Sequence, residues 1–140
     1  MRALGIDLGE ERIGIALSSG SVASPLETVL RSGNHGTDHS RILAIAAEWE
    51  VDTLVVGLPL SLDGSEGPAA VLVRTEIAEL VATTLLSVVP YDERFTTVTA
   101  TRLLKQGAVP GRSQRQMVDQ VAAAVMLQAW LDGHVTQSDS

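Results

Sequence analysis

The sequence predicts an α/β fold with a mixed five-stranded sheet, an antiparallel meander followed by parallel strands, and helices on both faces. Three short alternating segments come first, separated by short polar links, as is typical of antiparallel strands. Two later apolar segments each follow a segment with helical periodicity, as is typical of parallel strands joined by crossover helices. The 140 residues, 45% of them hydrophobic and 19% charged, fit one globular domain.

The first three strands are predicted from alternation. Residues 4–8 place apolar side chains on one face and Asp7, between two glycines, on the other. Residues 12–17 alternate in the same way and predict the second strand. Residues 21–30 predict a third, and Pro25 should make it an edge strand or a bulged one, because proline cannot donate a hydrogen bond to the ladder.

A polar segment carrying His35 and His39 follows, and we expect it to be a loop. Because the sequence shows no third ligand for a metal there, we interpret both histidines as solvated. Thr37 or Asp38 is expected to cap a helix that runs to about Trp49.

Two parallel strands and a helix follow. Residues 53–58 form a continuous apolar run, as expected for a strand buried on both faces. Pro68 fits the first turn of a helix that runs to about Thr84. Residues 86–91 predict the last strand, which places the charged segment 92–94 at its carboxyl end.

Two more helices complete the predicted fold. Thr96 or Thr97 is expected to cap a helix ending near Gln106. The last helix, from about Ser113 to Leu131, is apolar nearly all round, which indicates that it is buried.

Composition sets limits on the function. We expect one domain over residues 1–133 and a short polar tail over 134–140. The absence of cysteine excludes disulfides, thiolate zinc sites and cysteine nucleophiles. No apolar run approaches the roughly 18 residues of a membrane span, and the first strand begins without a signal-peptide pattern, so we expect a cytoplasmic protein without membrane association.

The net charge of −7 argues against extensive coating by nucleic acid, but the basic residues are unevenly distributed. Nine of the ten are arginine, which suits bidentate phosphate contacts. Half of them lie in a segment that has no acidic residue, namely Arg94, Arg102, Lys105, Arg112 and Arg115. A local nucleic-acid-binding patch and an ordinary solvated surface are both consistent with this pattern.

Acidic residues occur at three places that a mixed sheet could bring together. Asp7 lies on the first strand, Asp92 and Glu93 follow the last strand, and Asp119 lies on the last helix. Two simpler explanations stay open: Asp7 could bond its own loop, and Asp119 could be favoured by an early helical turn. Carboxylates without histidine or cysteine suit Mg²⁺ or Mn²⁺, and two such ions about 3.5–4 Å apart can drive phosphodiester hydrolysis. The acids therefore indicate a nuclease-type site.

Four motifs, in this order and spacing, resemble the YqgF/RuvX family: GIDLGEERIGIA, VVGLPLSLDGSEG, YDERFTT and VDQVAAAVMLQ. The first motif alone also resembles actin-like kinases and chaperone ATPases, but the four together are specific. The resemblance covers about residues 3–132 and implies a ribonuclease H-like fold and a metal-dependent nuclease.

By this resemblance Asp7, Glu93 and Asp119 are the metal-binding catalytic carboxylates, with Mg²⁺ or Mn²⁺ as the cofactor. The adjacent Asp92 is the alternative catalytic acid to Glu93, which we favour. Other motif positions are expected to shape the rim of the site, namely Arg12, Gly57, Pro59 and Gly64. We expect phosphate or nucleic-acid contacts from Arg12, Arg94, Thr96, Thr97, Arg102, Arg112 and Arg115.

The family is described both as Holliday junction resolvases and as nucleases that mature the 5′ end of 16S ribosomal RNA precursor. We favour the second function, in ribosome biogenesis, because a junction resolvase needs two sites on a symmetric dimer and this acidic chain shows no broad basic surface. The expected partners are precursor rRNA, with branched DNA as the alternative, and ribosomal particles; the sequence leaves monomer or homodimer open. The rival class is a non-catalytic RNA- or ribosome-binding module, whose binding would survive loss of Asp7.

Overall fold

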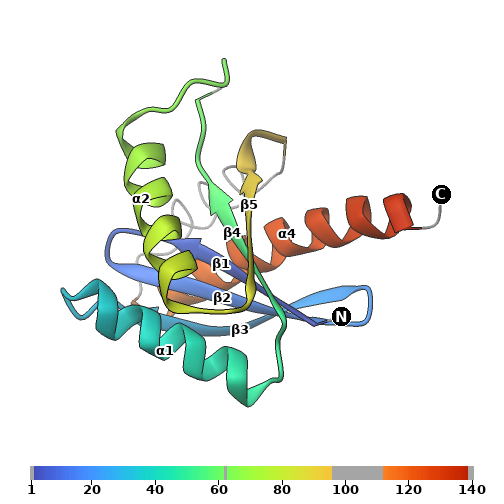
Figure 1. Ribbon diagram of the computed structural model, residues 1–140, viewed down its shortest axis with the longest axis horizontal. Coiled ribbons are helices and arrows are strands. Elements are labelled where there is room, and N and C mark those ends of the chain that lie inside the picture. Colours follow the sequence, from blue (N-terminus) through green and yellow to red (C-terminus); the bar gives the residue numbers. More distant parts are fainter. Residues whose placement is uncertain (1, 62, 96–111, 139–140) are drawn as a thin grey trace.

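The structure, a computed structural model, describes residues 2–61, 63–95 and 112–138, without the side chains of residues 95, 112–117 and 134–138 (Figure 1). The elements in chain order are β1 (Ala3–Leu8), β2 (Arg12–Ser19), β3 (Val22–Leu30), α1 (His35–Glu48), β4 (Thr53–Leu58), α2 (Pro68–Thr83), β5 (Ser87–Asp92), the 3-10 helix η1 (Glu93–Phe95) and α4 (Arg112–Ser138). The strands form one mixed sheet in the order β3-β2-β1-β4-β5. β1, β2 and β3 pair antiparallel, whereas β4 pairs parallel with both β1 and β5, which confirms the predicted fold class.

The third strand, β3, is both an edge strand and a bulged one. Ile15 of β2 lies opposite Glu27, but the next residue, Ala16, lies opposite Pro25, so that β3 carries one extra residue at this point. The extra residue is Leu26, directly after Pro25, whose nitrogen could not donate to the ladder. This confirms the expectation from the sequence.

Helices cover both faces of the sheet, and alternation along the strands feeds a separate core on each side (Figure 1). Leu4 and Ile6 of β1 pack with the buried residues of α1 and α2 in one core. Ala3 of β1 and Val55 of β4 pack with α4 in the other, against small residues such as Ala123. A fully buried leucine or isoleucine contributes about 1.5–3 kcal/mol, so these two cores fix the sheet between its helices.

The start of α1 differs from the prediction. The helix is capped by Asn34, whose side-chain oxygen accepts a hydrogen bond of 2.9 Å from the backbone nitrogen of Thr37. Asp38 faces backward instead and accepts a bond of 3.0 Å from the backbone nitrogen of Ser32. The expected loop and caps were therefore wrong, because asparagine is an equally good N-cap residue and lies earlier in the chain. As a result, both histidines of this segment lie in the helix, and the interpretation of both as solvated is wrong for His39, which is 3% exposed.

The end of the chain also differs from the prediction. α4 continues to Ser138, well past the predicted end near Leu131, and includes most of the segment expected to be a polar tail. The helix predicted from Thr96 or Thr97 to Gln106 lies outside the described residues. No helix in the described part of the chain is both long enough and apolar enough to cross a membrane.

Candidate active site

Asp7 lies on the central strand β1 with a glycine beside it on each neighbouring strand. Gly14 of β2 is its direct partner across the antiparallel pair. On the other side, Gly57 of β4 comes one residue after Val56, whose partner on β1 is Ile6. Residues at the same level of adjacent strands project to the same face, here the face covered by α4. The Asp7 carboxylate therefore has space on both sides that no side chain of the sheet fills.

The last helix fills the space above Gly14. A Cβ atom on Gly14 would clash with the backbone carbonyl of Asp119 and lie only 3.1 Å from the Cβ of that residue. α4 can thus cross β2 at this point only because the strand carries a glycine there. The crossing places Asp119, which is 9% exposed, over Gly14, the strand partner of Asp7.

The third carboxylate fills the space above Gly57. A Cβ atom on Gly57 would collide with the carboxylate of Glu93, whose Cδ would be 2.8 Å away. Glu93 therefore folds from η1 back over the end of β4, where it is 7% exposed, as is Asp7. The three acidic residues Asp119, Asp7 and Glu93, from separate elements, thus lie in one row across the sheet, over positions 14, 7 and 57, and we call them the carboxylate row.

Arg12 compensates part of this negative charge. Its Nε donates a hydrogen bond of 2.7 Å to Oδ2 of Asp119, and the arginine side chain is only 21% exposed. Leaving a carboxylate buried and ionised without a partner would cost several kcal/mol. The geometry favours a role for Arg12 in holding Asp119, and its predicted contact with nucleic acid stays a prediction.

The structure distinguishes the two adjacent acids at the carboxyl end of β5. Both oxygens of Asp92 accept hydrogen bonds from the Arg94 guanidinium, at 2.7 to 3.1 Å, and Oδ1 also accepts one of 2.9 Å from the Arg94 backbone. Hydrogen bonding to the Arg94 side chain lowers the pKa of Asp92. Gly64 makes room for this arginine, because a Cβ there would lie 2.9 Å from Arg94 Nη1. Both oxygens of Asp92 are thus bound by Arg94, whereas Glu93 lies over Gly57 in the row with Asp7.

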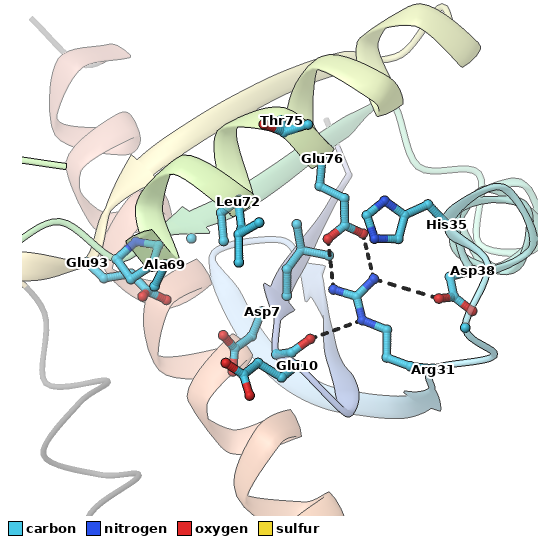
Figure 2. Close-up of a pocket in the computed structure, with 16 residues that line it drawn as sticks. Asp7, Glu10, Arg31, His35, Asp38, Ala69, Leu72, Thr75, Glu76 and Glu93 are labelled. Atoms are coloured by element: carbon cyan, nitrogen blue, oxygen red, sulfur yellow. Dashed lines mark hydrogen bonds and ion pairs between the residues drawn. The ribbon is translucent and has the colours of Figure 1, made fainter. Parts of the chain in front are cut away.

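A pocket of about 580 Å³ opens at the carboxyl ends of β1 and β4 (Figure 2). Asp7, Glu10 and Glu93 line one end of it together with Ala69 at the start of α2, and Glu76 of α2 lines the other end together with the start of α1. Ligands of open α/β sheets bind at this edge, outside the carboxyl ends of the strands. Asp119 is not among the described residues that line the pocket, so it reaches the row from the α4 side.

Sequence reasoning missed a buried ion-pair network at the far end of this pocket. Arg31, just after β3, donates to both oxygens of Glu76 on α2, at 2.7 and 2.8 Å, and to the carbonyl of Gly9 at 3.0 Å. His39 Nε2 lies 2.7 Å from the same carboxylate. Burial alone would raise the pKa of Glu76, but hydrogen bonds from Arg31 and His39 outweigh it and lower that pKa. The available signal was an acid on the apolar face of a helix, next to Ile77.

Several predicted nucleic-acid contacts lie beyond the description. Thr96, Thr97 and Arg102 are outside the described residues, and so are the side chains of Arg112 and Arg115. Their predicted roles therefore stay predictions.

A family model described as "RuvX: Holliday junction resolvase" matches residues 1–133. The chain belongs to the RuvX family. Curated relatives named "Putative pre-16S rRNA nuclease" agree: the one from Anaeromyxobacter sp. (strain Fw109-5) is 46% identical over 95% of this chain and 98% of its own length. The one from Myxococcus xanthus is 42% identical, over 96% of this chain and 89% of its own length. The resemblance seen in the four sequence motifs is thereby confirmed.

Solved structures show the fold that this RuvX-family chain shares. Thermus thermophilus RuvC in complex with a Holliday junction substrate superposes with a TM-score of 0.61, at 18% identity, over 96% of both chains. A second T. thermophilus RuvC structure gives 0.58 at 17% identity, over 97% of both chains. At such identities the likeness concerns the fold alone, and it confirms the predicted ribonuclease H-like fold.

Proposed function

We propose that this protein is a metal-dependent nuclease that hydrolyses phosphodiester bonds in the 5′-end processing of 16S rRNA precursor during ribosome biogenesis. The observation that carries the proposal is the row of three buried carboxylates, Asp7, Glu93 and Asp119, over two glycines. The names of the curated relatives agree with the nuclease function that the sequence predicts, and they favour RNA as the substrate.

The row suits a hard divalent cation. Its donors are carboxylate oxygens alone, which Mg²⁺ and Mn²⁺ prefer over nitrogen or sulfur ligands. Asp7, Glu93 and Asp119 would hold the metal, after small side-chain movements, because their carboxylate oxygens do not all lie within 4.8 Å of one another among the described residues. When bound, such ions supply an activated water and stabilise the leaving oxygen of a phosphodiester.

The residues of the chain itself orient this site. Asp7 is fixed by its position on the central strand, with β2 and β4 hydrogen-bonded on either side. Arg12 of β2 holds the Asp119 carboxylate through a hydrogen bond, and the Glu93 carboxylate packs against Gly57 of β4. All three residues are buried, at 7 to 9% exposure, which limits the conformations that their carboxylates can adopt before substrate arrives. The pocket admits a phosphate to the row from the strand ends.

Partners and location belong to the same proposal. Precursor rRNA is the favoured substrate, presented free or within ribosomal particles, and the arginines between 94 and 115 would contact its phosphates. Ribosome assembly then places the activity in the cytoplasm.

The second candidate is the resolution of four-way DNA junctions, which the printed description of the matching family model favours. It differs from the first in a testable way. A resolvase cuts two strands symmetrically and so needs a second copy of this site in a dimer, whereas trimming of an RNA end needs only one.

The test compares labelled precursor 16S RNA with a synthetic four-way junction, each with Mg²⁺, Mn²⁺ or EDTA. Wild-type protein runs beside Asp7→Asn, which removes the charge and keeps the shape, and beside Asp52→Asn, the same change at an exposed loop acid. We expect metal-dependent cleavage of the RNA that only Asp7→Asn abolishes. Cleavage of the junction alone would favour the resolvase. Cleavage of neither, with RNA binding equal in all three proteins, would favour a non-catalytic binding module.

A further inference from the structure

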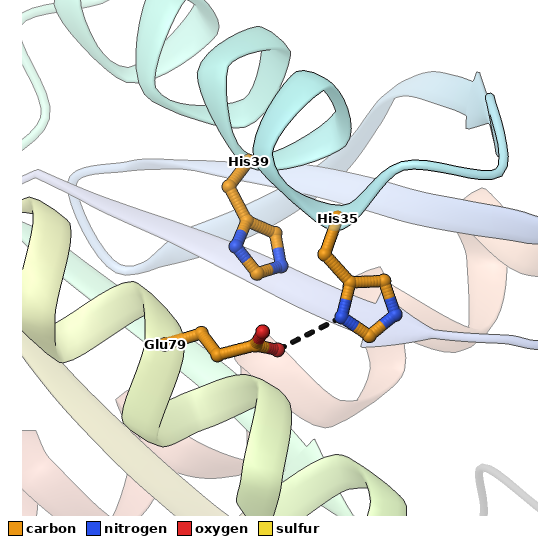
Figure 3. A group of neighbouring side chains, drawn as sticks. All are labelled: His35, His39 and Glu79. Atoms are coloured by element: carbon orange, nitrogen blue, oxygen red, sulfur yellow. Dashed lines mark hydrogen bonds and ion pairs between the residues drawn. The ribbon is translucent and has the colours of Figure 1, made fainter.

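Two histidines and a glutamate gather where α1 faces α2 (Figure 3). His35 and His39 are one helical turn apart on α1, and Glu79 projects toward them from α2. One ring nitrogen of each histidine and one carboxylate oxygen of Glu79 all lie within 4.8 Å of one another. The closest pair is His35 Nδ1 and Glu79 Oε1, at 2.8 Å.

This cluster is built on rigid supports. His39 is 3% exposed, and its ring is positioned by Glu76, which Arg31 in turn holds through two hydrogen bonds. The spacing of four residues puts both rings on the same side of the helix, with centroids 5.7 Å apart. Arg31 donates hydrogen bonds to both oxygens of Glu76, so this carboxylate keeps a positive partner even if His39 turns a ring nitrogen toward an ion.

The other two members of the cluster are accessible. The side chains of His35 and Glu79 are 52% and 45% exposed, so an ion can reach them and small rotations can adjust their positions. Zinc-type ions bind imidazole nitrogen and carboxylate oxygen at about 2.0–2.2 Å. Donor atoms already within 4.8 Å of one another need only such rotations to converge on one ion.

We propose that His35, His39 and Glu79 bind a transition-metal ion of the Zn²⁺ class, which ties the start of α1 to α2. Two imidazoles and one carboxylate favour Zn²⁺, Co²⁺ or Ni²⁺ over Mg²⁺ and Mn²⁺, so this site selects a different ion from the all-oxygen row at Asp7. His35 also lines the pocket that Asp7 lines, so the ion would brace the far wall of that pocket. The proposal does not depend on the nuclease function.

Co²⁺ provides a direct test, because its visible absorption reports nitrogen-containing, low-coordinate sites. Metal-stripped full-length protein is titrated with Co²⁺ in excess Mg²⁺, and Zn²⁺ is then added as a competitor. His35→Gln and Glu79→Gln are the test variants, since both residues are exposed and their loss should leave the fold intact. His134→Gln makes the same chemical change at the third histidine of the sequence and is the control.

We expect one Co²⁺ per chain, displaced by Zn²⁺. Each test variant should lower the affinity for Co²⁺ by at least roughly 10–100-fold, because even the loss of a group that only hydrogen-bonds a metal ligand has an effect of that size. His134→Gln should leave the affinity unchanged. Absence of Co²⁺ binding to wild type, or wild-type affinity in both test variants, would overturn the proposal and leave His35 and Glu79 as an ion pair between two helices. Binding that Asp7→Asn abolishes and His35→Gln spares would also overturn it, by moving the ion to the carboxylate row.

Discussion

Substitution of Gly57 by alanine tests whether the geometry of the carboxylate row matters. The new methyl group would overlap the Glu93 carboxylate, with Cδ at 2.8 Å and Cγ at 3.2 Å, so the end of that side chain must move. Because the obstructing atoms belong to a flexible side chain, we expect the free energy of unfolding to fall by no more than about 1–3 kcal/mol. A displacement of about 1 Å at a catalytic group can cost on the order of 10²-fold in rate, and we expect Gly57→Ala to lose that much.

The assay pairs single-turnover cleavage of precursor RNA with urea unfolding of the same samples. Gly133→Ala is the matched control, because a Cβ there meets nothing within 4 Å. Gly14→Ala provides a contrast: its Cβ would meet the backbone of Asp119 rather than a side chain, so it should lose both stability and activity. A Gly57→Ala protein that cleaves at the wild-type rate would refute the assignment of Glu93 to the site.

The remaining predictions concern the charges around the site. Arg12→Gln should lower the cleavage rate and lower the free energy of unfolding by about 1.5–3 kcal/mol, because Asp119 loses a charged hydrogen-bond donor. Urea unfolding and cleavage assays measure both effects, and a variant as stable and as active as wild type would contradict this prediction. Glu76→Gln should cost about 3–5 kcal/mol in urea unfolding, since it removes the closer of the two anions of the buried Arg31 and leaves only Asp38 at 3.7 Å, and a loss below 1 kcal/mol would argue against the network. The pKa of Glu76 is lower in the folded protein than in the unfolded one, so at acidic pH the unfolded state binds more protons. The stability that ionised Glu76 provides is therefore fully present above its unfolded pKa of about 4.3. This stability is lost as the pH falls through the folded pKa. Unfolding measured from pH 7 downward should therefore show a steeper loss for wild type than for Glu76→Gln, and parallel curves would contradict the assignment.

Local patterns in the sequence predict most of the fold. Alternation around Asp7 identifies β1 and the face that its carboxylate occupies, and the run from Thr53 to Leu58 matches the observed β4. Caps are harder, because several nearby side chains compete for the same backbone nitrogens, and Asn34 wins over Thr37 through its position in the chain. Such competition is decided by geometry that the sequence does not display.

The site is predictable to a smaller extent, since its decisive contacts join distant parts of the chain. The three acids could be named from the sequence, but the choice of Glu93 over Asp92 depends on Arg94 binding one and Gly57 making room for the other. The bond from Arg12 to its partner on α4 spans 107 residues, and the ion pair of Arg31 spans 45. Neither leaves a local periodic signal, because each depends on how a helix crosses the sheet.

The most direct test of the central claim is single-turnover cleavage of precursor RNA by four isosteric variants in Mg²⁺ or Mn²⁺, namely Asp7→Asn, Glu93→Gln, Asp119→Asn and Asp92→Asn. The proposed site predicts that the first three each lose about 10²-fold or more in rate while remaining folded. It predicts that Asp92→Asn retains most of the activity, because Asp92 is bound to Arg94 and lies outside the carboxylate row. Loss of activity in Asp92→Asn together with normal cleavage by Glu93→Gln would contradict the site as described.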